Sequence, residues 1–348
     1  MTTITSLRIR RPDDMHVHLR EGKIMKEVLP HTASVFGRAL VMPNLKEPVL
    51  TRGDAAAYKR AIRQELDSQK SGEPQRFQPL MTLKLTKRTE PLDMHTAKEA
   101  GVVAVKLYPE GVTTNSADGI SDVEALYPVF EAMQACGMVL SIHAESPHAF
   151  CLERERDFVE AYLPSLLEFF PRLKVVIEHV STAHAVDFVF NAPTKNLAAT
   201  ITAHHLLLTL DDVVGGMLSP HNFCKPVAKR PEDREAVLRA ATSGSSKFFF
   251  GSDSAPHTRD TKEWRAGCAG CFTAPVALPL LTQIFEERGA IEKLEPFTSV
   301  HGAEFYGLPL NADEITLHRE TWMVPESYEN IVPFWSGRTL PWRVAERP

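Results

Sequence analysis

The sequence predicts an α/β fold, a (β/α)8 TIM barrel with a short C-terminal extension. Three observations support this prediction. The chain has 348 residues, a length common among α/β barrels. Eight short runs rich in β-branched or apolar residues alternate with helical patterns. Polar side chains follow most of these runs, at the strand ends where active sites of this fold lie. We therefore expect a single domain over residues 1–348.

Four of the predicted strands contain continuous apolar runs, as expected for parallel strands that are covered on both faces. Val102-Val103-Ala104-Val105 and Phe248-Phe249-Phe250 are clear examples. The eight predicted strands span residues 14–18, 38–42, 78–83, 102–108, 138–143, 174–179, 197–203 and 247–251. The helical patterns between them include residues 52–69, 122–136, 150–170, 182–190 and 231–243.

Two stretches interrupt this alternation. Residues 109–119 form a polar loop rich in Gly, Thr, Asn and Ser, which could be a lid or an ordinary surface crossing. From about residue 311 the pattern changes to short segments that contain Trp335, Pro341 and Trp342. We interpret residues 311–348 as an extension that packs on the barrel.

Composition excludes several classes of protein. Hydrophobic residues make up 43% and charged residues 24%, which are ordinary globular values. The net charge of -5 argues against nucleic acid as a partner. The N-terminal residues lack the apolar core of a signal peptide, and no apolar run is long enough to span a membrane. We therefore expect a cytoplasmic protein without a membrane partner.

The five cysteines are odd in number and scattered, which is typical of reduced thiols rather than of a disulfide framework. Cys268 and Cys271 form a lone C-x-x-C pair. Without a second pair, this motif does not indicate a zinc ribbon. We interpret it as part of a Gly-rich loop, with a redox motif as the alternative.

The stretch from Met15 to Arg20 is the most informative in the chain. In an extended strand, side chains two apart point the same way, so His16, His18 and Arg20 should form one polar row. Met15, Val17 and Leu19 should then face the opposite side. A His-x-His pair can lie on a solvated strand or bind a metal, and an arginine can bind an anion.

Similar polar residues lie within or follow six of the other seven predicted strands. Imidazole and carboxylate groups are the nitrogen and oxygen ligands that Zn²⁺ accepts, and in a barrel they would surround one mouth. Ser252-Asp253-Ser254 could alternatively be a plain turn or a helix cap. The strand-end residues are His16, His18, Asn44, Lys106, His143, His179, His204, His205 and Asp253.

Lys106 is unusual because it lies within an apolar strand, where a buried ammonium group is costly. It could form a salt bridge with Asp253 or Glu178. Alternatively, burial and nearby metal ions could favour the neutral amine, which can add carbon dioxide to form a bridging carbamate. His204 and His205 remain unassigned, either as partners that orient metal ligands or as satisfied core groups.

Several motifs together resemble the dihydroorotases of the amidohydrolase superfamily, from about residue 13 to Leu308. The position of His16 favours the shorter, stand-alone bacterial type, because hydantoinase relatives place a β-sandwich segment first. The motifs are His16-Val17-His18-Leu19-Arg20, Met42-Pro43-Asn44, Val105-Lys106-Leu107-Tyr108, His143-Ala144-Glu145, Glu178-His179, Gly251-Ser252-Asp253-Ser254-Ala255-Pro256-His257 and Gly267-Cys268-Ala269-Gly270-Cys271-Phe272.

The resemblance implies two Zn²⁺ ions per subunit. By similarity, His16, His18 and Asp253 hold one zinc, His143 and His179 hold the other, and carboxylated Lys106 bridges them. The implied reaction is the reversible cyclisation of N-carbamoyl-L-aspartate to L-dihydroorotate and water, a step of pyrimidine (UMP) synthesis. The resemblance also implies a homodimer.

The resemblance further implies a catalytic role for Asp253, which would carry a proton between the attacking water and the departing nitrogen. The implied substrate-binding residues are Arg20, Asn44, Lys225, His257 and Ala269, and Thr113 and Thr114 would close over the substrate. Two alternatives remain: a hydrolase of hydantoins or dihydropyrimidines, and a catalytically silent barrel that acts as a scaffold.

Overall fold

The computed structural model describes residues 4–69, 77–112, 116 and 119–345. An eight-stranded parallel sheet runs through the centre of the molecule in the order β2-β3-β4-β5-β6-β7-β8-β9, which is also the order of the strands in the sequence. The strands are β2 (Asp13–Val17), β3 (Arg38–Val41), β4 (Gln78–Lys84), β5 (Ala104–Leu107), β6 (Val139–Ile142), β7 (Val175–Ile177), β8 (Leu197–Ile201) and β9 (Phe248–Phe250).

Backbone hydrogen bonds close this sheet into a barrel beyond the end of β9. The amide of Asp253 donates to the carbonyl of His16 at 2.8 Å, and the amide of His18 donates to the carbonyl of Ser254 at 3.0 Å. The predicted TIM barrel is therefore confirmed. All eight predicted strands are present, with ends that differ from the prediction by no more than a few residues, which is the ordinary uncertainty of strand ends.

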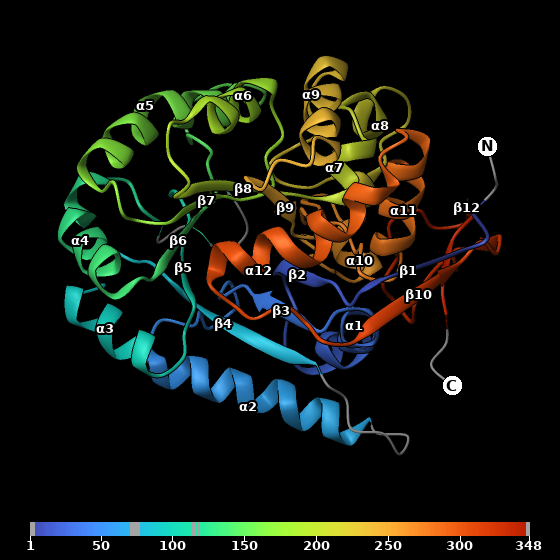
Figure 1. Ribbon diagram of the computed structural model, residues 1–348, viewed down its shortest axis with the longest axis horizontal. Helices are drawn as coiled ribbons and strands as arrows, with labels where there is room; N and C mark the ends of the chain where they lie inside the picture. The colour runs from blue at the N-terminus through green and yellow to red at the C-terminus, as the bar shows by residue number, and fades with distance from the viewer. Residues whose placement is uncertain (1–3, 70–76, 113–115, 117–118, 346–348) are drawn as a thin grey trace.

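Helices surround the barrel (Figure 1). The predicted helices at 52–69, 182–190 and 231–243 match α2, α6 and α9, whereas α5 begins four residues later than predicted, and a 3₁₀ turn replaces the start of the helix predicted at 122. The helices are α1 (Gly22–Val35), α2 (Arg52–Ser68), α3 (Pro91–Glu99), α4 (Tyr127–Cys136), α5 (Arg154–Phe169), α6 (Ala183–Asn191), α7 (Ala203–Leu207), α8 (Asp211–Val214), α9 (Pro231–Thr242), α10 (Arg259–Lys262), α11 (Ala277–Glu287) and α12 (His301–Tyr306).

Local sequence explains several helix ends. The Thr51 hydroxyl accepts from the amide of Asp54 at 3.2 Å, and the Asp54 carboxylate accepts from the amide of Thr51 at 2.9 Å, so α2 starts with a capping box. Helix α4 ends at Cys136 and is followed by Gly137, which has a φ of 67°. Glycine tolerates this left-handed conformation at low cost, so the chain can turn directly into β6.

The core has two layers. One group of buried side chains fills the inside of the barrel, and a larger group lies between the strands and the surrounding helices. The inner group consists of Met15, Leu40, Met42, Leu80, Ala104, Val139, Val176, Ala198 and Phe249. It fills the barrel below the polar strand ends, so those ends lie on a packed floor rather than over an open channel.

The predicted alternation along β2 is correct for the polar row and wrong for one apolar residue. Met15 packs inside the barrel, whereas Val17 and Leu19 pack in the outer layer. The register of β2 against β3 shifts between Asp14 and Val17, so an irregularity of the β-bulge kind changes which way the side chains point.

The C-terminal segment forms four short strands outside the barrel. Strand β10 (Glu314–His318) lies antiparallel between β1 (Ser6–Arg10) and β13 (Arg343–Val344), and β11 (Trp322–Met323) pairs with β12 (Thr339–Leu340). Figure 1 shows β1 and β10 side by side at the edge of the molecule. Within the described part of the chain, no helix has the length and apolar character needed to cross a membrane.

Candidate metal centre and active site

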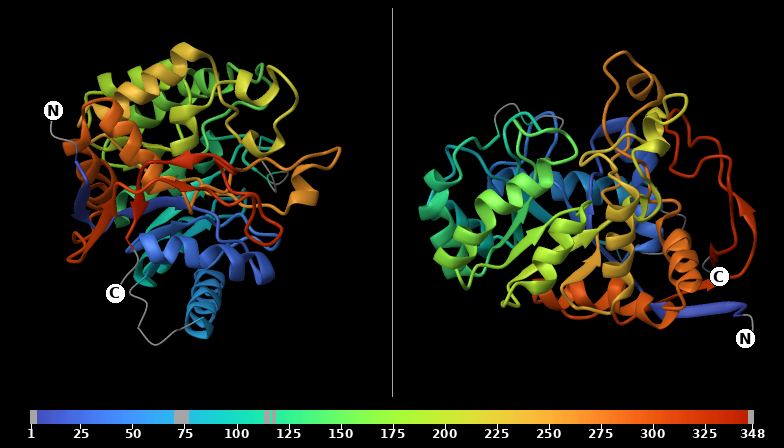
Figure 2. Two further views of the ribbon diagram at one scale, coloured as in Figure 1. Left: turned by 90° about the vertical axis from the view of Figure 1, so that its right-hand side faces the viewer. Right: turned by 90° about the horizontal axis from the view of Figure 1, so that it is seen from above.

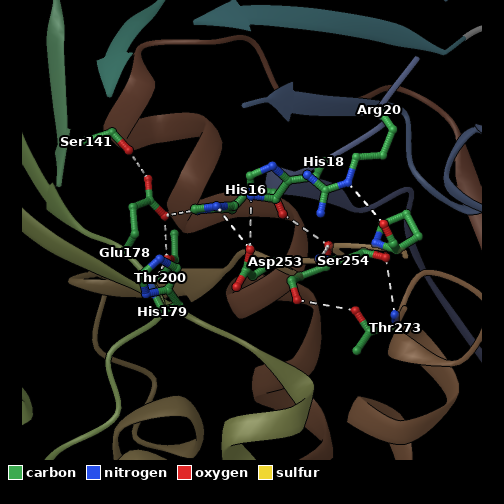
Figure 3. Close-up of polar contacts among 12 residues, drawn as sticks. His16, His18, Arg20, Ser141, Glu178, His179, Thr200, Asp253, Ser254 and Thr273 are labelled. Atoms are coloured by element: carbon green, nitrogen blue, oxygen red, sulfur yellow. Dashed lines mark hydrogen bonds and ion pairs between the residues drawn. The ribbon is translucent and has the colours of Figure 1, made fainter. Parts of the chain in front are cut away.

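The polar row of β2 meets Asp253 where the barrel closes. His16 Nε2 and His18 Nε2 each lie 3.3 Å from Asp253 Oδ1, and one ligand atom from each of the three residues lies within 4.8 Å of the others (Figure 3). His16 is 1% exposed and Asp253 is 6% exposed. The structure therefore brings together the three residues that were predicted to hold one metal ion.

Glu178 determines which nitrogen of His16 carries the proton. Glu178 Oε2 lies 2.8 Å from His16 Nδ1, and this carboxylate also accepts from the hydroxyls of Ser141 and Thr200, the latter at 2.6 Å. Burial raises the pKa of Glu178, but the charges of His16 and Lys106 and the hydrogen bonds lower it to about 2. The ionised carboxylate accepts from Nδ1 and leaves the lone pair of His16 on Nε2, beside Asp253.

Asp253 is held in the ionised state. Burial raises its pKa, but the charge of His16 and the hydrogen bond with His18 hold it below its ordinary value. Burial also lowers the pKa of His18 to about 4, so this imidazole is neutral near pH 7. His16 Nε2, His18 Nε2 and Asp253 Oδ1 thus meet within 3.3 Å contacts, and a bound cation would replace the proton between them and receive an electron pair from each.

Lys106 on β5 is fully buried, and its ammonium nitrogen has no hydrogen-bond partner among the described residues. The salt bridges considered for this lysine, to Asp253 or Glu178, do not form. Nζ lies 5.4 Å from the centre of the Tyr108 ring. Burial lowers the pKa of Lys106 to about 8, against the charges of Glu178 and Asp253, which raise it. A buried polar nitrogen without a hydrogen-bond partner is costly, so the position of Lys106 Nζ fits a site in which this nitrogen interacts with a bound group such as a metal ion.

His143 and His179 lie next to the first group of ligands. The ring of His179 lies 4.7 Å from that of His143 and 5.1 Å from that of His16, measured between centroids. His143 Nε2 lies 2.7 Å from Glu145 Oε2. Since the carboxylate can only accept, the lone pair of His143 is on Nδ1. His179 Nδ1 is buried and has no partner among the described residues.

Arg20 continues the polar row toward the mouth of the barrel. Its Nε donates to the carbonyl of Pro256 at 3.1 Å, and an Nη2 proton is donated to His257 Nε2 at 3.0 Å. Burial and the charges of Arg20 and Lys262 lower the pKa of His257 to about 3, so its imidazole is neutral and can accept. The hydrogen bond therefore holds Arg20 next to His257, and both residues are predicted to bind substrate.

One pocket connects the metal ligands with the predicted substrate-binding residues. Asn44, Lys225 and Ala269 line it, together with Tyr108, which the site prediction does not include. The Tyr108 hydroxyl is buried and lacks a partner in the described structure. A signal was present in the sequence, because Tyr108 follows Lys106 by two residues, the spacing that puts side chains on one face of a strand. The lining residues are His16, His18, Arg20, Asn44, Tyr108, His143, His179, Lys225, Asp253, Ala255, Ala269 and Gly270.

Three non-glycine residues of the site have left-handed backbone conformations. The φ angles are 59° for Arg20, 44° for His179 and 42° for Asp253. Such conformations cost energy and are concentrated at functional sites. The predicted lid residues Thr113 and Thr114 lie outside the described residues.

The chain matches the model of the amidohydrolase family over residues 13–324. It belongs to the amidohydrolase family. Within that family, a curated relative from Azoarcus, named dihydroorotase, is 47% identical over 98% of this chain and 99% of its own length. The chain is therefore an enzyme of the dihydroorotase group.

Solved structures of this family agree. The dihydroorotase of Saccharomyces cerevisiae, crystallised with 5-fluoroorotic acid, is 36% identical and superimposes with a TM-score of 0.91 over 98% of this chain and 99% of that one. The Campylobacter jejuni dihydroorotase is 38% identical, with a TM-score of 0.87 over 98% of each chain.

Proposed function

We propose that this amidohydrolase interconverts N-carbamoyl-L-aspartate and L-dihydroorotate plus water, as a zinc-dependent dihydroorotase of pyrimidine synthesis. The observation that carries the proposal is the single pocket in which buried His16, His18 and Asp253 lie beside Arg20. Metal-type ligands and an anion-binding fork thus share one cavity. The Azoarcus relative and the yeast structure support the same reaction, since both are named for it.

The donor set fits two zinc ions. His16, His18 and Asp253 would hold one, His143 and His179 would hold the second, and Lys106 would bridge them. The unpartnered Nζ of Lys106 and Nδ1 of His179 support this assignment. When bound, such ions act as Lewis acids that polarise a carbonyl and lower the pKa of water.

Lys106 would act as a bridge only after it has been carboxylated. Its neutral amine attacks carbon dioxide, an N–C bond forms, and one proton leaves to solvent. The product is a carbamate anion with two oxygens. The lowered pKa of Lys106 favours this step, because burial increases the fraction of neutral amine near pH 8.

Asp253 would move the proton in the reaction. In the hydrolytic direction, its carboxylate accepts a proton from the attacking water and returns it to the departing ring nitrogen. In the biosynthetic direction these transfers reverse. The depressed pKa of Asp253 keeps the carboxylate ready to accept a proton at neutral pH.

Arg20 would select the substrate. Both substrate and product carry a carboxylate away from the reacting carbonyl, and a guanidinium group can bind it through two parallel hydrogen bonds. Asn44 and His257 would add donors, while the backbone at Lys225 and Ala269 would contact the edge of the pyrimidine ring. Asn44, Lys225 and Ala269 line the same pocket as Arg20, which supports this arrangement.

A direct assay tests the proposal. Purified protein should convert carbamoyl aspartate to dihydroorotate and the reverse, and a strong chelator should abolish both reactions until Zn²⁺ is added back. Turnover of hydantoin or dihydrouracil in place of dihydroorotate would favour the related cyclic amidase. Absence of bound metal and of any turnover would favour a scaffold. A homodimer stays a prediction, which sedimentation analysis can test.

A further inference from the structure

A second cluster of metal-type ligands lies outside the proposed catalytic set. One ligand atom from each of His204, His205 and Cys224 lies within 4.8 Å of the others. Cys224 Sγ is 3.8 Å from His205 Nε2. His204 and Cys224 are completely buried, and His205 is 3% exposed. This second cluster belongs to α7 and to the segment that precedes α9, neither of which contributes a proposed catalytic ligand.

His204 is the observation that points to a ligand. Both of its ring nitrogens are buried and lack a hydrogen-bond partner in the described part of the chain. An imidazole without any partner in a protein interior is costly, because each polar atom has lost its hydrogen bonds to water. A bound cation would provide the missing partner.

His205 can also change its role. Its Nε2 lies 2.9 Å from the carbonyl of Pro226, which can only accept, so Nε2 carries the proton. Its Nδ1 lies 2.9 Å from the hydroxyl of Thr202, which can both donate and accept. For Nε2 to bind a cation, the proton would have to move to Nδ1, where Thr202 would accept it. The Pro226 carbonyl oxygen, which also accepts from the Cys224 thiol at 3.2 Å, would then have to turn aside or join the ion as a further ligand. An oxygen acceptor of this kind commonly orients histidine ligands.

A fourth donor is next to the cluster. Cys271 is 1% exposed and lies near enough to Cys224 to raise the pKa of that thiol, and its own Sγ lies 3.4 Å from the carbonyl oxygen of His221. Two imidazoles and two thiols form the Cys₂His₂ donor set that structural zinc sites use. Both cysteines are free thiols in the structure.

We propose that His204, His205 and Cys224, with Cys271 as the fourth donor, form a structural site for a thiophilic divalent cation of the zinc class. On binding, the thiols lose their protons to solvent and the imidazoles bind as neutral bases. The ion would join α7 to two segments of the pocket wall, because Lys225 follows Cys224 and Gly270 precedes Cys271. It would thus stabilise the wall beside the substrate without touching the reacting atoms.

Cobalt provides a test that separates this site from the catalytic one. A thiolate bound to Co²⁺ gives a sulfur-to-cobalt charge-transfer absorption in the near ultraviolet, and the proposed catalytic ligands contain no sulfur. Protein treated with a chelator and then titrated with Co²⁺ should show this absorption. Its intensity should rise until one cobalt ion per chain is bound at the thiolate site. Cys224→Ser removes one of the two proposed thiolate ligands and should lower the absorption by about half or more, whereas Cys151→Ser, which changes an exposed cysteine outside the cluster, should retain it.

A second variant guards against misfolding of the cysteine mutant. His204→Gln keeps both cysteines and should weaken cobalt binding at the thiolate site by about tenfold or more, since even the outer partners of metal ligands contribute that much. Circular dichroism would check that each variant is folded. Absence of the charge-transfer absorption in saturated wild-type protein, or its persistence at full strength in folded Cys224→Ser, would overturn the proposal.

Discussion

The Glu178 carboxylate lies 2.8 Å from Nδ1 of His16 and so directs the opposite nitrogen of that ring toward Asp253. The carboxylate is itself held by the hydroxyls of Ser141 and Thr200, so it cannot rotate away without losing both contacts (Figure 3). A buried carboxylate that orients a histidine ligand in this way also makes the imidazole a stronger base.

Replacing Glu178 by glutamine should therefore weaken the site without removing a ligand. An amide can donate to His16 as well as accept from it, so the imidazole would no longer be held in one tautomer. We expect Glu178→Gln to lower turnover or zinc affinity by about 10- to 100-fold. Elemental analysis and the carbamoyl aspartate assay would measure both effects. Glu160→Gln, at an exposed ion pair with Arg156, is the control and should leave both unchanged.

Arg20 provides a test of substrate choice. Arg20→Lys keeps the positive charge and removes the planar fork, so one charge-assisted hydrogen bond to the substrate carboxylate should be lost. We expect kcat/KM for dihydroorotate to fall by about 10- to 100-fold, which corresponds to about 1.4–2.7 kcal/mol. Steady-state kinetics would measure the change. Arg63→Lys, which changes an exposed arginine, is the matched control and should keep wild-type kinetics. If Arg20→Lys also kept wild-type kinetics, the role assigned to Arg20 would be wrong.

Lys106 should be necessary for metal binding. Lys106→Ala removes the nitrogen that would carry the carbamate, so we expect loss of bound zinc. Turnover should fall by about 100-fold or more, since even the removal of a residue that only orients a metal ligand costs about 10- to 100-fold. Short carboxylates such as acetate, which can occupy the vacated space, should restore part of the activity. Two zinc ions per chain and normal turnover without added carboxylate would show that the bridging carbamate is wrong.

His31 should contribute to acid sensitivity away from the catalytic site. It packs against Tyr328, at 4.2 Å between ring centroids, and Phe272, and burial lowers its pKa from 6.5 to about 4. The unfolded chain therefore binds a proton that the folded protein does not, between these two pKa values. The contribution to stability is complete above pH 6.5 and is lost as the pH falls toward 4.

The corresponding variant is His31→Gln, which cannot be protonated. Urea unfolding at pH 7 and pH 5 should show a smaller fall in the free energy of unfolding for His31→Gln than for wild type. His95→Gln changes an exposed histidine on α3 and should keep the wild-type difference between the two pH values. Equal falls in all three proteins would rule out a contribution from His31.

The barrel could be predicted because strand-like runs alternate with helical patterns and most of these runs lead to a polar residue. Helix α1 was not predicted, since Pro30 lies inside it and no side chain caps its start. The inward position of Met15 was also missed, because it depends on a shift of register between β2 and β3 that hydrophobic alternation cannot reveal. The register between neighbouring strands is a long-range property, and these local patterns carry little information about it.

The candidate ligands could be predicted as residue types at strand ends, but their mutual orientation could not. The left-handed backbone at Arg20, His179 and Asp253 is unusual for side chains other than glycine, and no local signal indicates it. Glu145 follows His143 by two residues, which is the spacing of side chains on one face of a strand. The 2.7 Å contact between His143 Nε2 and Glu145 Oε2 nevertheless depends on how the chain turns after β6. Tertiary packing decides such details.

The pairing of β1 with β10 has a consequence for protein synthesis. Ser6 pairs with His318, so β1 leaves the ribosome long before its partner exists. During that time it is an unprotected sheet edge, which other chains could pair with. Ribosomes that stop before residue 314 would release chains in which this edge has no partner. Aggregation of truncated products should therefore begin at the N-terminal strand, far in sequence from the missing residues.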